Sequence, residues 1–159
     1  LNMTREEKFM LEAVKLAGKG VMANEGGPFG CVIVKGDEIV GRGNNRVLTD
    51  NDPTSHAEVV AIRDACARLG TYQLDDCEIY ASCEPCPMCL GAIYWARPKV
   101  VYYAGTKDDA AKSGFDDSFI YREIELPREQ RKIPFLKIQL SDALAPFRVW
   151  DEKSDKKEY

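Results

Sequence analysis

The chain has 159 residues, and 22 lysine and arginine residues stand against 26 aspartate and glutamate residues, for a formal net charge of −4. A chain of this length can bury one hydrophobic core, so we expect a single domain over residues 1–159. The acidic balance makes nucleic acid an improbable partner, no apolar run is long enough to span a membrane, and the charged start LNMTREEK is unlike a secretory signal, so we expect a cytoplasmic protein.

The first part of the chain predicts a helix and then a hairpin. Apolar side chains recur at helical spacing from Phe9 to Val21, so residues 5–23 are expected to form an amphipathic helix. After the loop NEGGPFG, the strand-like segments CVIVK and EIVGRG flank the turn Gly36-Asp37, which is typical of a β-hairpin.

A second helix is expected to begin next to the single histidine of the chain. Thr54 or Ser55 can cap this helix, and Gly70 ends it. His56 and Glu58 therefore lie in its first turn, at the start of an apolar helical run.

A third helix brings two cysteines together. The strand EIYASC leads into EPCPMCLGAIYWA, in which the prolines suit a helix start. Cys86 and Cys89 are three positions apart and so lie on one face of the first turn.

The rest of the chain completes an α/β pattern. We expect KVVYYAG to form a strand and TKDDAAKSG to form a short helix. Residues 115–134 are expected to form an irregular connection to a fifth strand, FLKIQL. The last stretch, DALAPFRVWDEKSDKKEY, is expected to be helical at its start. Alternating helices and strands indicate an α/β layered fold around one sheet of about five strands, with a mainly parallel half where helices cross over.

His56, Cys86 and Cys89 form a set of ligands suited to catalytic zinc. Such a site uses three protein ligands and leaves a fourth position for water, and one neutral imidazole with two thiolates is a common set. All three residues lie at expected helix N-termini, where the helix dipole favours thiolates. Glu58 is placed to take a proton from the water in the fourth position and to pass it to a substrate.

Other interpretations of the cysteines remain open. A structural zinc site would fill its fourth position, for which Cys83 is the nearest thiol, and such a zinc module need not be an enzyme. Cys83, Cys86 and Cys89 also match the start of an iron–sulfur binding run, but no cysteine follows Cys89. Glu58 argues against a non-enzymatic module, because a structural site has no use for a carboxylate beside the fourth position.

The segments HAE and PCPMC resemble the H-x-E and P-C-x-x-C signature of the zinc-dependent cytidine deaminase superfamily. Within it, GGPFGCVIV, NDPTSHAEVVAIR, the stretch from YQLDD to VVYYAG, GFDDSFIYREI and the terminal KKEY are similar to the small bacterial guanine deaminases. The resemblance implies a three-layer αβα fold with a central five-stranded mixed sheet. It also implies one Zn²⁺ per subunit on His56, Cys86 and Cys89, and hydrolysis of guanine to xanthine and ammonia with Glu58 as the proton shuttle.

The same resemblance assigns substrate contacts. Asn45 would hydrogen-bond the purine edge and Phe29 would stack on the ring. Without the resemblance, Asn45 would be interpreted as a turn residue and Phe29 as a core residue. The Ala57 N–H, at a helix N-terminus, suits the substrate carbonyl oxygen. Asp117 matches a second acid near the substrate amine, and its neighbour Asp116 is the alternative.

The charged end of the chain is by itself typical of disorder. In the enzymes it resembles, the C-terminal segment, here from about 143 to 159, is exchanged within a homodimer and helps to close the partner's active site. Trp95 and Tyr159 would then line a shared pocket.

The sequence leaves several substrates open for this kind of site. The tRNA adenosine deaminases share the H-A-E and P-C-x-M-C motifs, although the net charge of −4 argues against RNA. Guanosine, cytosine and cytidine remain alternatives, since the shape of the pocket decides between them.

Overall fold

A four-stranded sheet organises the part of the chain that ends at Asp117. The structure is a computed structural model that describes residues 2–159, and it divides into one unit that ends at Asp117 and a second that spans Ser118–Tyr159. The elements of the first unit are α1 (Arg5–Met22), β1 (Gly30–Lys35), β2 (Glu38–Asn44), α2 (Val47–Asp50), α3 (Ala57–Leu69), β3 (Cys77–Cys83), α4 (Pro87–Ala96), β4 (Val100–Gly105) and α5 (Lys107–Lys112).

The sheet is mixed, with the strand order β2-β1-β3-β4. β1 is antiparallel to both β2 and β3, and β3 is parallel to β4, so the described residues contain one parallel pair. The hairpin of β1 and β2 confirms the prediction from the turn Gly36-Asp37.

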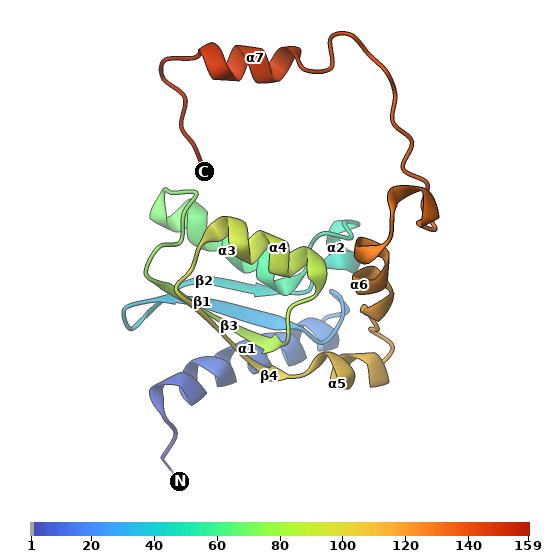
Figure 1. Ribbon diagram of the computed structural model, residues 1–159. Helices are drawn as coiled ribbons and strands as arrows, with labels where there is room; N and C mark the ends of the chain where they lie inside the picture. Colours follow the sequence, from blue (N-terminus) through green and yellow to red (C-terminus); the bar gives the residue numbers. More distant parts are fainter. Residues whose placement is uncertain (1) are drawn as a thin grey trace. The chain divides into compact units, whose positions relative to one another are not determined.

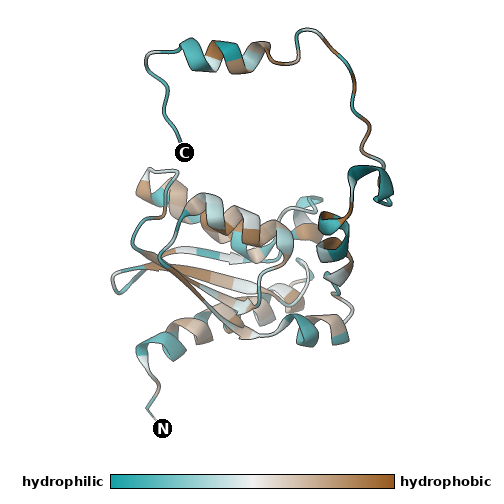
Figure 2. Ribbon diagram, viewed as in Figure 1, coloured by the Kyte–Doolittle hydropathy of each residue, from teal (hydrophilic) through white to brown (hydrophobic). Residues whose placement is uncertain are grey.

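Helices cover both faces of this sheet, with α1 on one face and α3 and α4 on the other (Figure 1). The strand side chains alternate between the faces. Cys31 and Ile33 belong to the core cluster that includes α3 and α4 residues, whereas Val32, Val34 and Tyr80 pack with α1 side chains. The three-layer αβα arrangement is therefore present, and the central strands are accordingly coloured as hydrophobic in Figure 2.

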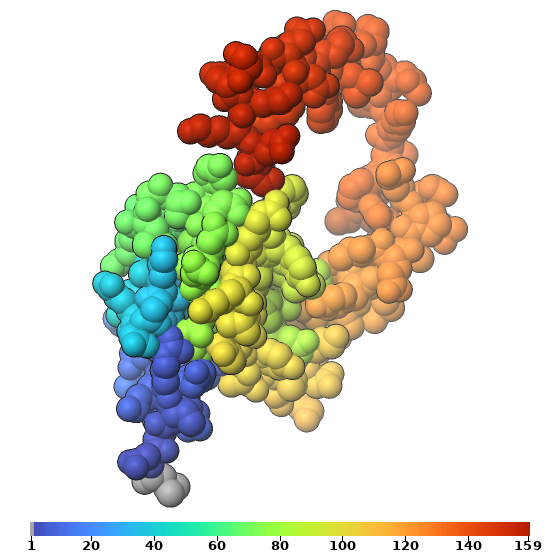
Figure 3. Space-filling view, turned by 60° about the vertical axis from the view of Figure 1, so that its left-hand side comes forward, coloured from blue at the N-terminus to red at the C-terminus, as the bar shows by residue number. Residues whose placement is uncertain are grey.

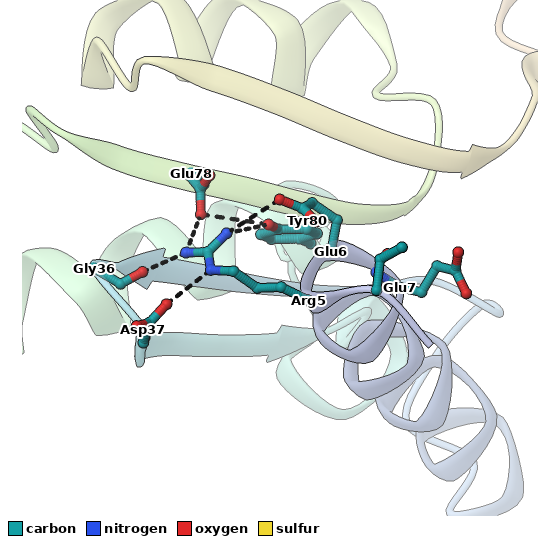
Figure 4. A network of polar contacts seen from close by, with 8 residues as sticks. Arg5, Glu6, Glu7, Gly36, Asp37, Glu78 and Tyr80 are labelled. Atoms are coloured by element: carbon teal, nitrogen blue, oxygen red, sulfur yellow. Dashed lines mark hydrogen bonds and ion pairs between the residues drawn. The ribbon is translucent and has the colours of Figure 1, made fainter. Parts of the chain in front are cut away.

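An arginine at the start of α1 ties this helix to the sheet (Figure 4). Arg5 Nε lies 2.8 Å from Asp37 Oδ1 in the hairpin turn, and Arg5 Nη2 lies 2.8 Å from Glu78 Oε1 on β3. Arg5 also donates to the Gly36 carbonyl oxygen and to the Tyr80 hydroxyl. The Glu78 carboxylate is buried, so its charge is offset mainly by Arg5.

The prediction of a fifth strand is wrong. Residues 135–140 pair with no strand in the described part of the chain, and the sheet has four strands rather than five. The apolar residues Phe135, Leu136, Ile138 and Leu140 are all exposed. Strand-like alternation indicates a local tendency only, because a strand also needs a free sheet edge to pair with.

The second unit contains α6 (Ser118–Glu125), the 3₁₀ helix η1 (Arg128–Gln130) and α7 (Ala145–Glu152), joined by an extended stretch (Figure 1). The sequence predicted α7 but placed an irregular connection where α6 forms. Within residues 2–159, no helix combines the length and apolar character needed to span a membrane.

Candidate active site

The first turn of α3 carries the histidine and the glutamate of the H-x-E motif. His56, rather than Thr54 or Ser55, is the N-cap of α3. Thr54 donates its amide and hydroxyl hydrogens to Asp52 Oδ1, and the Ser55 hydroxyl contacts Asp50, so neither hydroxyl is used to cap the helix. Consequently the His56 side chain stands at the very end of the helix.

The first turn of α4 carries the two cysteines. Cys86 is the N-cap of α4, and its Sγ accepts the Cys89 amide hydrogen at 3.5 Å. His56 Nδ1 lies 3.4 Å from Cys86 Sγ and 3.6 Å from Cys89 Sγ. The starts of two helices thus bring together three ligand atoms, all within 4.8 Å of one another.

Charge is concentrated at this cluster. The Cys89 thiol donates a hydrogen bond to Cys86 and lowers the pKa of Cys86 to about 4, with His56 adding to the effect. The same hydrogen bond raises the pKa of Cys89, and the Cys86 sulfur raises that of His56. Metal binding requires both sulfurs as thiolates and would therefore release any proton that they hold.

The donor set fits zinc. Two thiolates and one imidazole within bonding reach of a single point leave a tetrahedral ion one open position. Cys83 is not part of the cluster of ligand atoms found in residues 2–159, and its thiol instead donates to the Thr106 carbonyl oxygen at 3.3 Å. The structure thus separates Cys83 from the fourth position that a structural site would fill.

Glu58 lies one residue inside α3 and is 7% exposed. Burial raises the pKa of its carboxyl group, and the nearby Cys86 sulfur adds to the rise. A hydrogen bond between Glu58 and Cys89 contributes to the pKa of both groups, which places the carboxyl group beside the metal cluster. A buried carboxyl group with a raised pKa is suited to accept a proton and to release it again.

Three further predicted residues lie close to this region. Asn45 is 6% exposed, and its backbone N–H donates to the Phe29 backbone carbonyl oxygen at 3.0 Å. The Phe29 ring meets the Phe115 ring edge to face, with centroids 5.1 Å apart. Ala57 is fully buried as the first residue of α3, where helix geometry leaves its N–H without an intrahelical acceptor. Sequence patterns did not single out Phe115, although the small residue Gly27 that accommodates its ring is visible in NEGGPFG.

The remaining predicted residues differ in their surroundings. Asp117 is half-buried, and burial raises the pKa of its carboxyl group, helped by the charge of Cys86. Asp116 is exposed. Trp95 is an exposed residue of α4, and Tyr159 is exposed at the end of the second unit.

Comparisons with known proteins show the family to which the chain belongs. Residues 3–105 match the family model of the cytidine and deoxycytidylate deaminase zinc-binding region. The guanine deaminase of Bacillus subtilis (strain 168) is 61% identical over 153 residues, which cover 96% of this chain and 98% of that protein. A tRNA-specific adenosine deaminase from the same strain is 39% identical over 112 residues, or 70% of this chain and 69% of that protein.

Solved structures agree with the sequence matches. The X-ray structure of guanine deaminase from Bacillus subtilis superimposes with a TM-score of 0.94 at 60% identity and covers 100% of this chain and 99% of that chain. Guanine deaminase from Nitrosomonas europaea gives a TM-score of 0.67 at 31% identity, over 74% of this chain and 66% of that chain. With a zinc-binding region matched over most of its length and His56, Cys86 and Cys89 gathered at one point, the chain belongs to the cytidine and deoxycytidylate deaminase family of zinc-binding proteins.

Proposed function

We propose that the chain is a zinc-dependent guanine deaminase that hydrolyses guanine to xanthine and ammonia. The observation that carries the proposal is 61% identity to the Bacillus subtilis enzyme over 96% of this chain, whereas the tRNA-specific relative is 39% identical over 70% of it. The buried Glu58 beside the three ligand residues supports a catalytic rather than a structural metal.

Glu58 moves the protons of this reaction. His56, Cys86 and Cys89 would hold a zinc ion, whose Lewis acidity would make a water molecule acidic enough to lose a proton near neutral pH. The Glu58 carboxylate takes that proton and delivers it to a ring nitrogen as the oxygen–C2 bond forms. It then takes the proton of the new C2 hydroxyl group and delivers it to the 2-amino group as the C2–N bond breaks, so that water and guanine yield xanthine and ammonia.

Asn45, Phe29 and Ala57 hold the purine. The Asn45 side chain hydrogen-bonds the purine edge, the Phe29 ring stacks on the base, and the Ala57 N–H donates to the carbonyl oxygen. The position of Asn45 beside Phe29 and the N-terminal place of Ala57 on α3 support this arrangement.

Asp117 is the second acid, and it assists the departure of ammonia. Its half-buried carboxyl group and the influence of Cys86 on its pKa support this role over that of the exposed Asp116.

The enzyme acts as a homodimer in which the segment from about 143 to 159 closes the partner's site, where Tyr159 and Trp95 line a shared pocket. The exposed apolar side chains of the second unit support such a dimer, because the folded chain alone leaves them in water. A reducing cytoplasm suits the enzyme, since two of its ligands must remain thiolates.

A tRNA adenosine deaminase is the second candidate, favoured by the similarity to the tRNA-specific enzyme. Ammonia release by the purified zinc protein, measured with guanine, guanosine, adenine, cytosine, cytidine and an anticodon-loop RNA, separates the candidates. We expect guanine to give the highest kcat/KM. A higher value for the RNA or for a nucleoside would overturn the assignment.

A further inference from the structure

We infer that Glu25 is a positioning residue for guanine binding. Glu25, Arg46, Asp50 and Ser55 form a continuous polar chain, here named the Glu25 network, which spans the stretch between Asn45 and His56. The inference rests on the proposed function, because Asn45 is the residue through which Glu25 acts on the purine.

Glu25 holds the chain on both sides of Asn45. Its backbone carbonyl oxygen accepts the backbone amide hydrogens of Leu48 and Thr49, with N···O distances of 3.1 and 3.3 Å. Its carboxylate forms an ion pair with Arg46 and accepts the Asn44 side-chain amide hydrogen at 3.4 Å. Residues immediately before and after Asn45 are therefore fixed by one carboxylate.

The network continues to the zinc ligand at the start of α3. Arg46 Nη2 lies 3.3 Å from Asp50 Oδ1, and the Ser55 hydroxyl donates to Asp50 Oδ2 at 3.0 Å. The Arg46 amide donates to the Ser55 carbonyl oxygen at 2.9 Å. Ser55 is 2% exposed and directly precedes His56, so the network ends against the metal cluster.

The orientation of the Asn45 amide depends on this local structure. Asn45 Oδ1 accepts the Val47 amide hydrogen at 3.1 Å, which directs the Nδ2 amino group elsewhere as a donor for a purine acceptor atom. Gly26 approaches so closely that a Cβ there would overlap Asn45 Oδ1. Moving the Glu25 loop thus moves the backbone against which Asn45 is packed.

The Glu25–Arg46 pair is partly shielded from water, with side chains 21% and 33% exposed. Such a pair orients its surroundings more strongly than an exposed one. The network lies outside both hydrophobic core clusters, so its loss is expected to leave the sheet folded. The two cysteine ligands lie on α4, which the network does not contact through any of these bonds. We therefore expect loss of Glu25 to weaken guanine binding and to spare zinc.

The test compares Glu25→Ala and the isosteric Glu25→Gln with Glu12→Ala. Glu12 forms a comparable but exposed ion pair with Lys15 on α1. Glu25→Ala is expected to raise the KM for guanine about tenfold, as for the loss of one charge-assisted contact, and to change kcat much less. Glu25→Gln keeps the hydrogen-bond acceptor and should recover part of the affinity. Glu12→Ala should retain the parental KM, and all three variants should retain one zinc per chain.

A double-mutant cycle shows whether Glu25 acts through Asn45. In an Asn45→Ala background, Glu25→Ala should raise KM little further. Hydrogen exchange in the 44–56 region should also accelerate in Glu25→Ala, because Asn44 and Arg46 lose the carboxylate that holds them. An unchanged KM in both Glu25 variants, or full additivity with Asn45→Ala, would overturn the inference. If the parental zinc protein released no ammonia from guanine, the proposed function would fail instead.

Discussion

Gly43 of β2 lies directly against Ala57 of α3. A Cβ added to Gly43 would overlap the Ala57 carbonyl oxygen and lie 2.6 Å from the Ala61 amide nitrogen. Because this backbone contact sets the distance between the sheet and the turn that carries His56 and Glu58, a single methyl group there has consequences at the metal cluster.

Gly43→Ala is expected to destabilise the fold by about 1–3 kcal/mol, the usual cost of overpacking. The start of α3 must move outward, so zinc affinity and guanine turnover should fall as well. Gly18→Ala is the matched control, since a Cβ on Gly18 meets no atom within 4 Å and alanine favours its helix. Thermal unfolding and zinc titration of both variants provide the measurements, and equal stability of the two would contradict the packing argument.

Glu58→Gln should abolish turnover while keeping the metal. The glutamine side chain fills the same volume but cannot take or return a proton, so kcat/KM for guanine is expected to fall about 10²–10⁴-fold. Zinc content, measured by elemental analysis, should stay at one per chain. Loss of zinc together with activity would mean that Glu58 supports the ligands rather than the chemistry.

Zinc coordination distinguishes a catalytic site from a closed structural one. We expect X-ray absorption of the zinc protein to show two sulfur ligands, one nitrogen and one oxygen. His56→Ala should lose zinc, whereas Cys83→Ser should keep it, because the Cys83 thiol contacts Thr106 outside the ligand cluster. A shell of four sulfur and nitrogen ligands would contradict the catalytic interpretation.

The sequence predicts the metal cluster well because its ligands sit at helix starts that local rules identify. His56 and Cys86 come directly before the apolar runs of α3 and α4, so their positions follow from short-range patterns. The segment FLKIQL shows the opposite case, since its alternation is strand-like and yet no sheet edge accepts it in the described chain. The Glu25 network could not be predicted either: Glu25 and Arg46 are 21 residues apart, and only the folded chain brings their side chains together.

The C-terminal segment is expected to act in trans. Deleting residues 151–159 should lower kcat/KM for guanine severalfold or more and leave zinc content unchanged, because an open site admits water. Mixing this deletion variant with Glu58→Gln should restore activity: the intact segment of one chain closes the site of the other, which still has Glu58. An unchanged kcat/KM after the deletion would refute the closure, and no recovery in the mixture would refute the exchange between subunits.

Alkaline pH should weaken the attachment of α1 through Tyr80. Burial raises the pKa of the Tyr80 hydroxyl to about 12, and the Glu78 carboxylate adds to the rise, whereas the unfolded chain titrates near 10. The folded state therefore holds this proton more tightly, so its contribution to stability is complete below pH 10 and is lost as the pH rises towards 12. Chemical unfolding at a series of pH values should show a steeper decline for the parental protein than for Tyr80→Phe, which has no proton to lose at this position. Parallel curves for the two proteins would show that the Arg5–Glu78–Tyr80 contacts do not control the alkaline transition.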